Sequence, residues 1–257
     1  MGRALAGRRI VVTRAREQAG DLVRALQAHG ADIVVAPVIR IEPLRDLDAL
    51  RSALDTLSAF RWVVFTSQNA VQVVFDRLSA WGLTPRVFAS AAVAAIGTAT
   101  AAALAERGVP PALVPDEFVG EALVEALAAR GALRGSRVLI PSAQDAREAL
   151  AAGLRAHGAE AVVIPIYRTV PVPADGHALA AELARGRIDA VTFTSSSTVR
   201  YFADLVGRDV ARSGRFVAAA LGPITARTAR DLGLGDVVEA EPHTVAGLVA
   251  ALARRFA

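Results

Sequence analysis

Arg9-Ile10-Val11-Val12 and Arg137-Val138-Leu139-Ile140 are two short β-branched runs that lie 128 residues apart. Three further pairs of segments align at nearly the same shift: 26–32 with 154–160, 65–67 with 193–195 and, at a shift of 125, 95–97 with 220–222. Self-similarity at a fixed spacing is the mark of a repeated structural unit. The chain therefore contains two copies of a unit about 125 residues long.

Each copy alternates short apolar runs with amphipathic stretches. In the first copy the predicted strands cover 9–13, 33–35, 62–66 and 92–96, and the predicted helices cover 18–28, 70–78, 98–107 and 121–130. Apolar runs separated by helices of about 10–15 residues are typical of parallel strands that are buried on both faces. The sequence predicts an α/β fold with two similar doubly wound parallel-sheet domains, produced by internal duplication.

The connection between the two domains is predicted to be ordered. The copies are not separated by a Gly/Ser-rich linker or a low-complexity segment. Two extended, Pro-bounded segments, 37–43 and 165–173, occupy equivalent positions in the repeat and are the candidates. The repeat by itself would divide the chain near residue 133.

Composition excludes several classes of protein. Of the 257 residues 53% are hydrophobic and 21% are charged, which excludes intrinsic disorder. The net charge is only +4, all basic residues are Arg, and no block of like charges occurs, so we expect no nucleic-acid partner. Cysteine is absent, which excludes disulfides and thiolate chemistry. Neither a signal peptide nor a bilayer-spanning run is recognisable, so we expect a soluble cytoplasmic protein with no membrane partner.

Most strong enzyme motifs are missing. The chain has no GxGxxG after a strand, no GxxxxGK[ST], no HExxH and no GxSxG, which argues against dinucleotide oxidoreductases, P-loop enzymes, zinc proteases and α/β-hydrolases. His29 and His157 share one repeat position beside a Gly, where a helix-ending role is expected. His177 and His243 fall in predicted loops without partner spacing, so no metal site is predicted.

Small hydroxyl residues and glycines gather where predicted strands pass into helices. A hydroxyl at such a junction can cap the helix, and the free N–H groups there can bind an anion. Because ligands of open α/β sheets bind at the carboxyl ends of strands, we expect two such edges to line a cleft for a ligand with many carboxylates. The candidate binding residues are Thr66, Ser67, Asn69, Gly97, Thr98, Thr100, Ser142, Thr194, Ser195, Ser196, Ser197, Gly222, Pro223 and Thr225.

Five stretches in a fixed order make a family resemblance specific. They are Phe65-Thr66-Ser67-Gln68-Asn69-Ala70-Val71, Ala95-Ile96-Gly97-Thr98-Ala99-Thr100-Ala101, Tyr167-Arg168-Thr169, Phe193-Thr194-Ser195-Ser196-Ser197 and Leu221-Gly222-Pro223-Ile224-Thr225-Ala226. In this order the chain resembles the uroporphyrinogen-III synthase family, from Arg9 to about Arg255. Each motif is weak alone, and their order and spacing carry the resemblance.

The resemblance implies a cofactor-free and metal-free lyase of tetrapyrrole, porphyrin and heme biosynthesis. Its substrate would be hydroxymethylbilane, a linear tetrapyrrole with eight carboxylates. Its product would be cyclic uroporphyrinogen III, formed with loss of water and inversion of the last ring. A monomer is implied, and a transient contact with the preceding pathway enzyme is left open.

The resemblance also implies that the chain crosses between domains. Domain 1 would comprise residues 1–37 and 172–257, and domain 2 would comprise residues 43–165. Residues 38–42 and 166–171 would then form a two-stranded antiparallel connector, with a cleft between the domains.

Tyr167 is the candidate catalytic residue. Its repeat counterpart is Ile39, so the two halves differ at this position, and a phenol could protonate the departing hydroxyl. The alternative is an aromatic side chain that packs one domain on the other. Arg14, Arg147 and Arg168 are candidates for bidentate carboxylate binding, and the alternative for each is a solvated surface charge.

Two other functions fit the same sequence. A non-catalytic two-lobe binding or sensor protein for a small polyanion would share the duplicated architecture. A pair of homologous lobes that has lost activity is the second alternative. The isomer of the cyclised product would separate both from an active enzyme.

Overall fold

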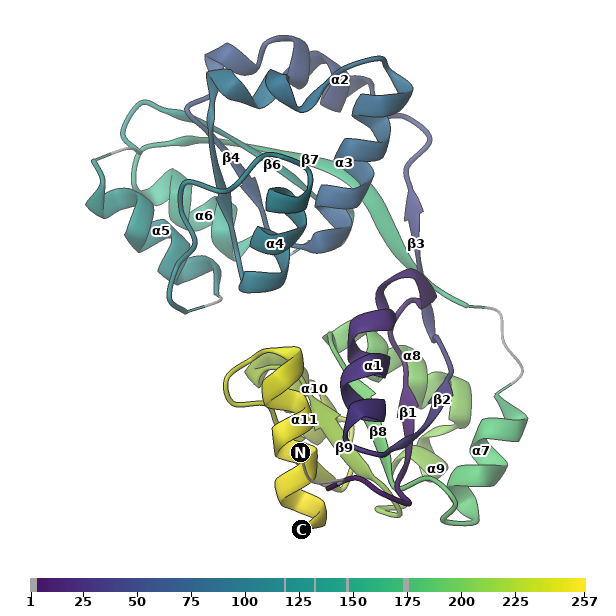
Figure 1. The fold of residues 1–257 in the computed structure, drawn as a ribbon. Helices are drawn as coiled ribbons and strands as arrows, with labels where there is room; N and C mark the ends of the chain where they lie inside the picture. The colour runs from purple at the N-terminus through teal and green to yellow at the C-terminus, as the bar shows by residue number, and fades with distance from the viewer. Residues whose placement is uncertain (1–3, 118, 132, 147, 173–175) are drawn as a thin grey trace. The chain divides into compact units, whose positions relative to one another are not determined.

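The computed structural model describes residues 4–117, 119–131, 133–146, 148–172 and 176–257. The chain forms two units (Figure 1): unit 1 comprises Met1–Arg40 with Thr169–Ala257, and unit 2 comprises Ile41–Arg168. Arg147, one of the three predicted arginine contacts, lies outside the described residues.

Unit 1 is built on a five-stranded parallel sheet, sheet A, in the order β10-β9-β8-β1-β2. Its strands are β1 (Arg9–Val12), β2 (Asp32–Val35), β8 (Ala190–Phe193), β9 (Val217–Ala220) and β10 (Asp236–Glu239). Its helices are α1 (Gly20–Ala28), α7 (His177–Ala184), α8 (Ser196–Val206), α9 (Arg208–Ala211), α10 (Pro223–Asp231) and α11 (Val245–Phe256), with a 3₁₀ turn at Arg16–Gln18.

Unit 2 is built on sheet B, in the order β3-β7-β6-β4-β5. Its strands are β3 (Ile39–Pro43), β4 (Trp62–Phe65), β5 (Ala92–Ala95), β6 (Arg137–Ala143) and β7 (Glu160–Pro171). Its helices are α2 (Asp48–Asp55), α3 (Gln68–Ala80), α4 (Thr98–Glu106), α5 (Gly120–Ala129) and α6 (Ala149–Ala156), with 3₁₀ turns at Leu57–Ala59 and Pro85–Ser90. The predicted α/β class with two mainly parallel sheets is confirmed.

Each sheet combines strands from both sequence repeats. Sheet A joins β1 and β2 of the first repeat to β8, β9 and β10 of the second, and sheet B joins β6 and β7 to β4 and β5. The repeat shift relates β1 to β6, β2 to β7, β4 to β8 and β5 to β9, and these equivalent strands occupy equivalent places in the two sheets. A division near residue 133, which the repeat alone would favour, therefore separates strands that are hydrogen-bonded neighbours.

Central strands are buried on both faces because their residues alternate between two apolar layers. Along β4, Val63 and Phe65 pack in one core cluster of unit 2, while Trp62 and Val64 pack in the other. Sheet A divides in the same way, with Val11 of β1 on one side and Ile10 and Val12 on the other. The helices pack against these two apolar faces, and loops follow the carboxyl ends of the strands.

β3 and β7 are neighbours in sheet B, and hydrogen bonds continue beyond β3 at both ends. The Leu44 N–H donates to the Ile166 carbonyl at 3.0 Å, and the Val172 N–H donates to the Val38 carbonyl at 3.1 Å. As the residue number rises in one strand, that of its partner falls, so this pairing is antiparallel. The predicted connector segments 38–42 and 166–171 belong to these two strands.

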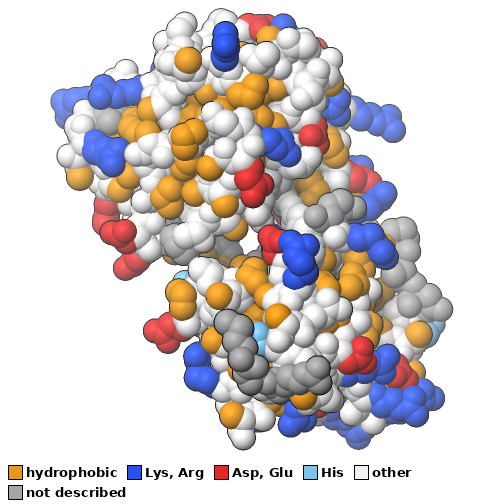
Figure 2. Space-filling model, in the orientation of Figure 1, with side chains coloured by type: hydrophobic (Ala, Val, Ile, Leu, Met, Phe, Trp, Pro, Cys, Tyr) orange, Lys and Arg blue, Asp and Glu red, His pale blue; other side chains and the backbone are white. Residues whose placement is uncertain are grey.

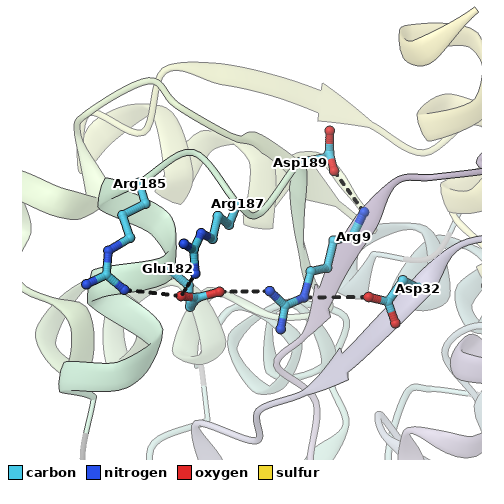
Figure 3. A network of polar contacts seen from close by, with 6 residues as sticks. All are labelled: Arg9, Asp32, Glu182, Arg185, Arg187 and Asp189. Atoms are coloured by element: carbon cyan, nitrogen blue, oxygen red, sulfur yellow. Dashed lines mark hydrogen bonds and ion pairs between the residues drawn. The ribbon is translucent and has the colours of Figure 1, made fainter.

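Ion pairs join the two sequence segments of unit 1 at the amino edge of sheet A (Figure 3). Glu182 of α7 accepts from Arg9 at 2.8 Å and from Arg187 at 3.2 Å, and Arg185 lies 3.4 Å away. Asp189 accepts from the Arg9 backbone N–H at 2.8 Å. The hydrogen bond with Arg9, supported by Arg187, holds the pKa of Glu182 below its usual value. The network therefore ties the start of β1 to the segment that leads into β8.

Candidate active site

Tyr167 lies near the end of β7 and packs in the core of unit 2. Its ring joins the apolar cluster around Val63 and Phe65, and the residue is 5% exposed. The Tyr167 hydroxyl oxygen lies 3.0 Å from the Ser67 hydroxyl oxygen. Ser67 follows β4 and caps α3, because its side chain accepts a hydrogen bond from the Ala70 N–H at 3.1 Å. The cap of one helix thus fixes the position of the phenol.

A bulge in β7 sets the direction of the Tyr167 side chain. Ser142 of β6 is paired with Pro165, but the next residue, Ala143, is paired with Tyr167, so Ile166 is the extra residue. In a regular strand Ile166 and Tyr167 would point to opposite faces, yet both are buried. An extra residue bends a strand and redirects its side chains. The bulge therefore delivers Tyr167 to the carboxyl edge of sheet B.

The surroundings of Tyr167 keep its phenol protonated. Burial is the largest effect and raises the pKa of Tyr167 above its usual value. Side-chain hydrogen bonds with Ser67 and Asn69 act in the other direction, and the Asp145 carboxylate raises the pKa further. A phenol with a raised pKa stays protonated at neutral pH.

Asp145 was missed by sequence reasoning. It stands in the turn after β6, one residue beyond Gln144, whose N–H donates to the Tyr167 carbonyl at 2.8 Å. Its position after a strand, between the predicted Ser142 and Arg147, was the available signal. Hydroxyls and arginines fit an anionic ligand and a carboxylate does not, so the expected ligand gave no reason to select Asp145.

The other predicted residues of unit 2 fall into two groups. Gly97 caps α4 with φ of 86°, a left-handed conformation that favours glycine, and Thr98 beside it is exposed. Thr66 and Asn69 are half-buried beside Ser67. Thr100 and Ser142 are only 4% and 2% exposed, and the Ser142 hydroxyl donates to the Ala143 carbonyl at 3.2 Å.

Arg168 points away from Tyr167. It is exposed, and its guanidinium pairs with Glu42 of β3 at 2.8 Å. The pair joins two neighbouring strands of sheet B. The structure therefore gives Arg168 a cross-strand partner and does not bring it together with the phenol.

The hydroxyls at the carboxyl edge of sheet A have partners within unit 1. Ser195 and Thr198 form a reciprocal capping box at the start of α8. Ser196 accepts a hydrogen bond from Thr228 at 2.8 Å. Thr194 and Ser197 are half-buried. Within unit 1, Ser195 therefore caps α8, and Ser196 joins α8 to α10.

Gly222, Pro223 and Thr225 open α10 at the same edge. Gly222 is the N-cap, Pro223 is the first helical residue and is exposed, and Thr225 is only 7% exposed. Arg14 follows β1 and is half-buried. Burial lowers the pKa of Arg14 and Asp21 opposes that effect, which places a partly desolvated guanidinium at this edge.

Across the described residues, no group of three or more His, Asp or Glu side chains is arranged to hold a metal ion. His29 and His157 end α1 and α6, as predicted from their repeat position. On the face drawn in Figure 2, arginines occupy several separate places on each unit with acidic side chains nearby. In the described part of the chain, no helix is both long and apolar enough to cross a bilayer.

Comparison with known proteins identifies the family. The family model described as uroporphyrinogen-III synthase HemD matches residues 20–250. The uroporphyrinogen-III synthase of Synechococcus elongatus is 34% identical over 96% of this chain and 95% of its own length. The porphyrin biosynthesis protein HemD of Ruminiclostridium josui is 31% identical over 97% of this chain. This chain spans 49% of that longer protein.

Solved structures share the fold. A mutant uroporphyrinogen III synthase from the extremely thermophilic bacterium Thermus thermophilus superposes with a TM-score of 0.65 and 21% identity, covering 96% of this chain and 98% of the other. The enzyme from Helicobacter pylori superposes with a TM-score of 0.60 and 17% identity, covering 97% of this chain and all of the other. The chain belongs to the uroporphyrinogen-III synthase family.

Proposed function

We propose that this chain converts hydroxymethylbilane to uroporphyrinogen III and that Tyr167 donates the proton that starts the reaction. The observation that carries the role of Tyr167 is the position of its hydroxyl, which contacts Ser67 at the carboxyl edge of sheet B. In open α/β sheets ligands bind at this edge. The family indicates the class of reaction, and Tyr167 is the proton donor that we propose for it.

The first step is cleavage of the carbon–oxygen bond of the hydroxymethyl group. The lone pair of the neighbouring pyrrole nitrogen drives the bond open, and the departing hydroxyl takes the Tyr167 proton and leaves as water. A cationic azafulvene and a phenolate result. When the last α-proton is lost after ring closure, the phenolate recovers it, so the overall reaction releases one water.

Access to the phenol requires an exchange of hydrogen bonds. Tyr167 is 5% exposed, whereas Ser67 and Asn69, which contact its hydroxyl, are half-buried. A substrate hydroxyl reaches the phenol by replacing one of these two contacts. Such contacts commonly rearrange when a catalytic complex forms. The burial also excludes water that would compete for the azafulvene.

The choice of isomer follows from positioning. The linear bilane cyclises unaided to the type I isomer, so the protein has to favour attack at the substituted carbon of the last ring. That attack forms a spiro ring. The bond from this carbon to its original bridge methylene then breaks, which regenerates an azafulvene, and the methylene bonds to the free α-carbon of the last ring, whose proton is lost. Orientation of bound reactants is equivalent to a large effective concentration and needs no additional acid or base. We assign the holding of the carboxylates to Arg14, to the accessible hydroxyls of Thr66, Thr98, Thr194 and Ser197, and to the backbone N–H of Gly222. Pro223 has no N–H and contributes only apolar contact beside them.

The remaining expectations extend the same proposal. Activity needs neither a metal nor a nucleotide, the chain works as a monomer in the cytoplasm, and any contact with the preceding pathway enzyme is transient. Exhaustive dialysis against a chelator should leave turnover unchanged. Full loss of activity that a divalent ion restores would contradict this.

The test of the function is the isomer of the product. Freshly made hydroxymethylbilane is supplied to the purified protein, and the products are oxidised and separated by chromatography. We expect the type III isomer to predominate, whereas buffer alone gives type I. Type I product alone, with folded protein present, would instead favour a binding or sensor protein for a polyanion.

A further inference from the structure

His243 occupies a fixed position at the carboxyl edge of sheet A. It follows β10, between Pro242 and Thr244. The Thr244 N–H donates to the Pro242 carbonyl at 2.7 Å, and the Thr244 side chain caps α11 by accepting from the Gly247 N–H at 3.1 Å. A Cβ atom on Gly247 would lie 1.8 Å from the Pro242 carbonyl oxygen, so only glycine permits this approach. The loop is therefore tied to the first turn of α11, and the backbone of His243 with it.

The His243 ring stands beside the start of α10. Its Cγ atom lies 3.9 Å from the place that a Cβ atom on Gly222 would occupy. Gly222 has φ of −162° and ψ of 172°, extended backbone that any residue adopts, so the conformation does not demand glycine. Apart from the His243 ring, no neighbouring heavy atom outside the adjoining backbone lies within 4 Å of that Cβ position, so the space beside the ring is open. The ring borders that space and is 41% exposed.

His243 can bind a second acceptor while it keeps its first. Its Nε2 atom lies 3.3 Å from the Glu239 Oε1 atom. A protonated imidazole donates from both ring nitrogens, so Nδ1 remains available for another carboxylate. The neighbouring hydroxyls at this edge are committed differently, since Ser195 closes a capping box and Ser196 accepts from Thr228. Together with Arg14, His243 is thus a side chain at this edge that can make a charge-assisted bond to a carboxylate.

We propose that His243 binds one carboxylate of the tetrapyrrole, in the space beside Gly222. The inference rests on the proposed function, because the ligand class is the polycarboxylate substrate or product. The role is recognition only, with no covalent or proton-transfer step. Because the role is recognition only, loss of His243 should affect affinity and not the chemical step.

The experiment compares three variants in steady-state turnover of hydroxymethylbilane. His243→Phe keeps a ring but removes both nitrogens, and we expect KM to rise about tenfold, the equivalent of one charge-assisted bond. His243→Gln should give a smaller increase, and His243→Lys should restore KM because it returns a cationic donor. The turnover number at saturation should stay within about twofold in all three. An unchanged KM in His243→Phe, or a fall in the turnover number alone, would overturn the proposal.

Gly222→Ala tests the same binding space without changing His243. The added methyl group meets the His243 ring at ordinary contact distance and introduces no backbone strain, so folding should be unaffected. It fills the room for the carboxylate, and KM should rise as in His243→Phe. A normal KM in Gly222→Ala would contradict the location of the binding site.

A binding measurement separates this proposal from the proposed function. Equilibrium titration with uroporphyrin III, a stable octacarboxylate probe, needs no turnover. If wild-type protein binds the probe about tenfold more tightly than His243→Phe but makes no type III product, the inference stands and the function fails. If turnover is normal and both proteins bind the probe equally, the function stands and the inference fails.

Discussion

The Tyr167 hydroxyl meets the Ser67 hydroxyl at 3.0 Å, and this contact has no equivalent in the described part of unit 1. The repeat relates Ser67 to Ser195, and Ser195 closes its capping box with Thr198. The position equivalent to Thr198 is Ala70, which has no side-chain oxygen to complete such a box, and the position equivalent to Tyr167 is Ile39. At the start of α8 the duplicated serine therefore closes a capping box, whereas at the start of α3 it contacts the phenol of Tyr167.

Replacing Tyr167 with phenylalanine should cost a modest amount of stability. The substitution keeps the ring in the core of unit 2 but removes one buried hydrogen bond, and Ser67 retains the Ala70 N–H as a partner. We expect the free energy of unfolding to fall by about 1 kcal/mol. Urea unfolding of Tyr167→Phe measures this. Tyr201→Phe is the control, because its hydroxyl donates a longer bond of 3.4 Å to the Thr169 carbonyl, and its loss should be smaller.

Ser67→Ala should affect both stability and rate. It removes the cap of α3, worth about 1 kcal/mol, and one of the groups that position the phenol. We expect turnover to fall about fivefold, less than for loss of the phenol itself. Ser67→Thr keeps a capping hydroxyl and should recover most of both losses. Normal turnover in a destabilised Ser67→Ala protein would limit Ser67 to a capping role.

Tyr167 should ionise at higher pH than an ordinary tyrosine. Burial and Asp145 outweigh the hydrogen bonds from Ser67 and Asn69, and the pKa is raised above the usual value of about 10. Because the folded-state pKa exceeds the unfolded one, the associated stability is complete below about pH 10 and is lost as the pH rises through the folded value. Phenolate absorbance of the Tyr201→Phe variant, which has one tyrosine, reports the titration. Ionisation at or below pH 10, about the ordinary value, would show that the phenol is solvated.

Glu182 should stabilise unit 1 at neutral pH and lose that effect in acid. Its folded-state pKa is lowered, chiefly by the hydrogen bond from Arg9, so the stabilisation exists above the unfolded pKa and disappears as the pH falls through the folded one. Glu182→Gln should lower the urea midpoint near pH 7 and converge with wild type near about pH 3. Glu160→Gln, which breaks one exposed pair with Arg137, is the control with a smaller effect. Equal midpoints for Glu182→Gln and wild type at neutral pH would show that the network does not stabilise unit 1.

The sequence predicted the parts of the fold that depend on local pattern. The apolar runs at 62–66 and 92–96 became β4 and β5, and Gly30 and Gly158 took the positive φ angles expected after α1 and α6. The repeat, however, reflects duplication and does not show which strands are neighbours in the fold. A division of the chain at the repeat boundary would have separated β1 from β8, which are paired. Pairing of strands that are about 180 residues apart is a long-range choice that no local window contains.

The sequence predicted which residues belong to the candidate site, but not which of their side chains are buried. Ser67 and Tyr167 were both candidates, but the bulge at Ile166 of β7, opposite Ser142 and Ala143 of β6, brings the phenol to the cap. A bulge depends on the register of two strands, which a single strand sequence does not encode. The same limit made Thr100 and Thr225 look accessible, since the hydroxyl of a helical threonine faces the core or the ligand according to helix rotation.

The central claim is that the Tyr167 hydroxyl donates the proton to the leaving group. The most direct test is the single-turnover rate of type III formation by Tyr167→Phe, with Tyr201→Phe as the matched control. We predict a rate about 10²-fold below wild type, with the isomer unchanged and product affinity preserved because the ring remains in place. Tyr201→Phe should turn over normally. Near-normal turnover by Tyr167→Phe with the same isomer ratio would contradict the claim and leave Tyr167 as a packing residue.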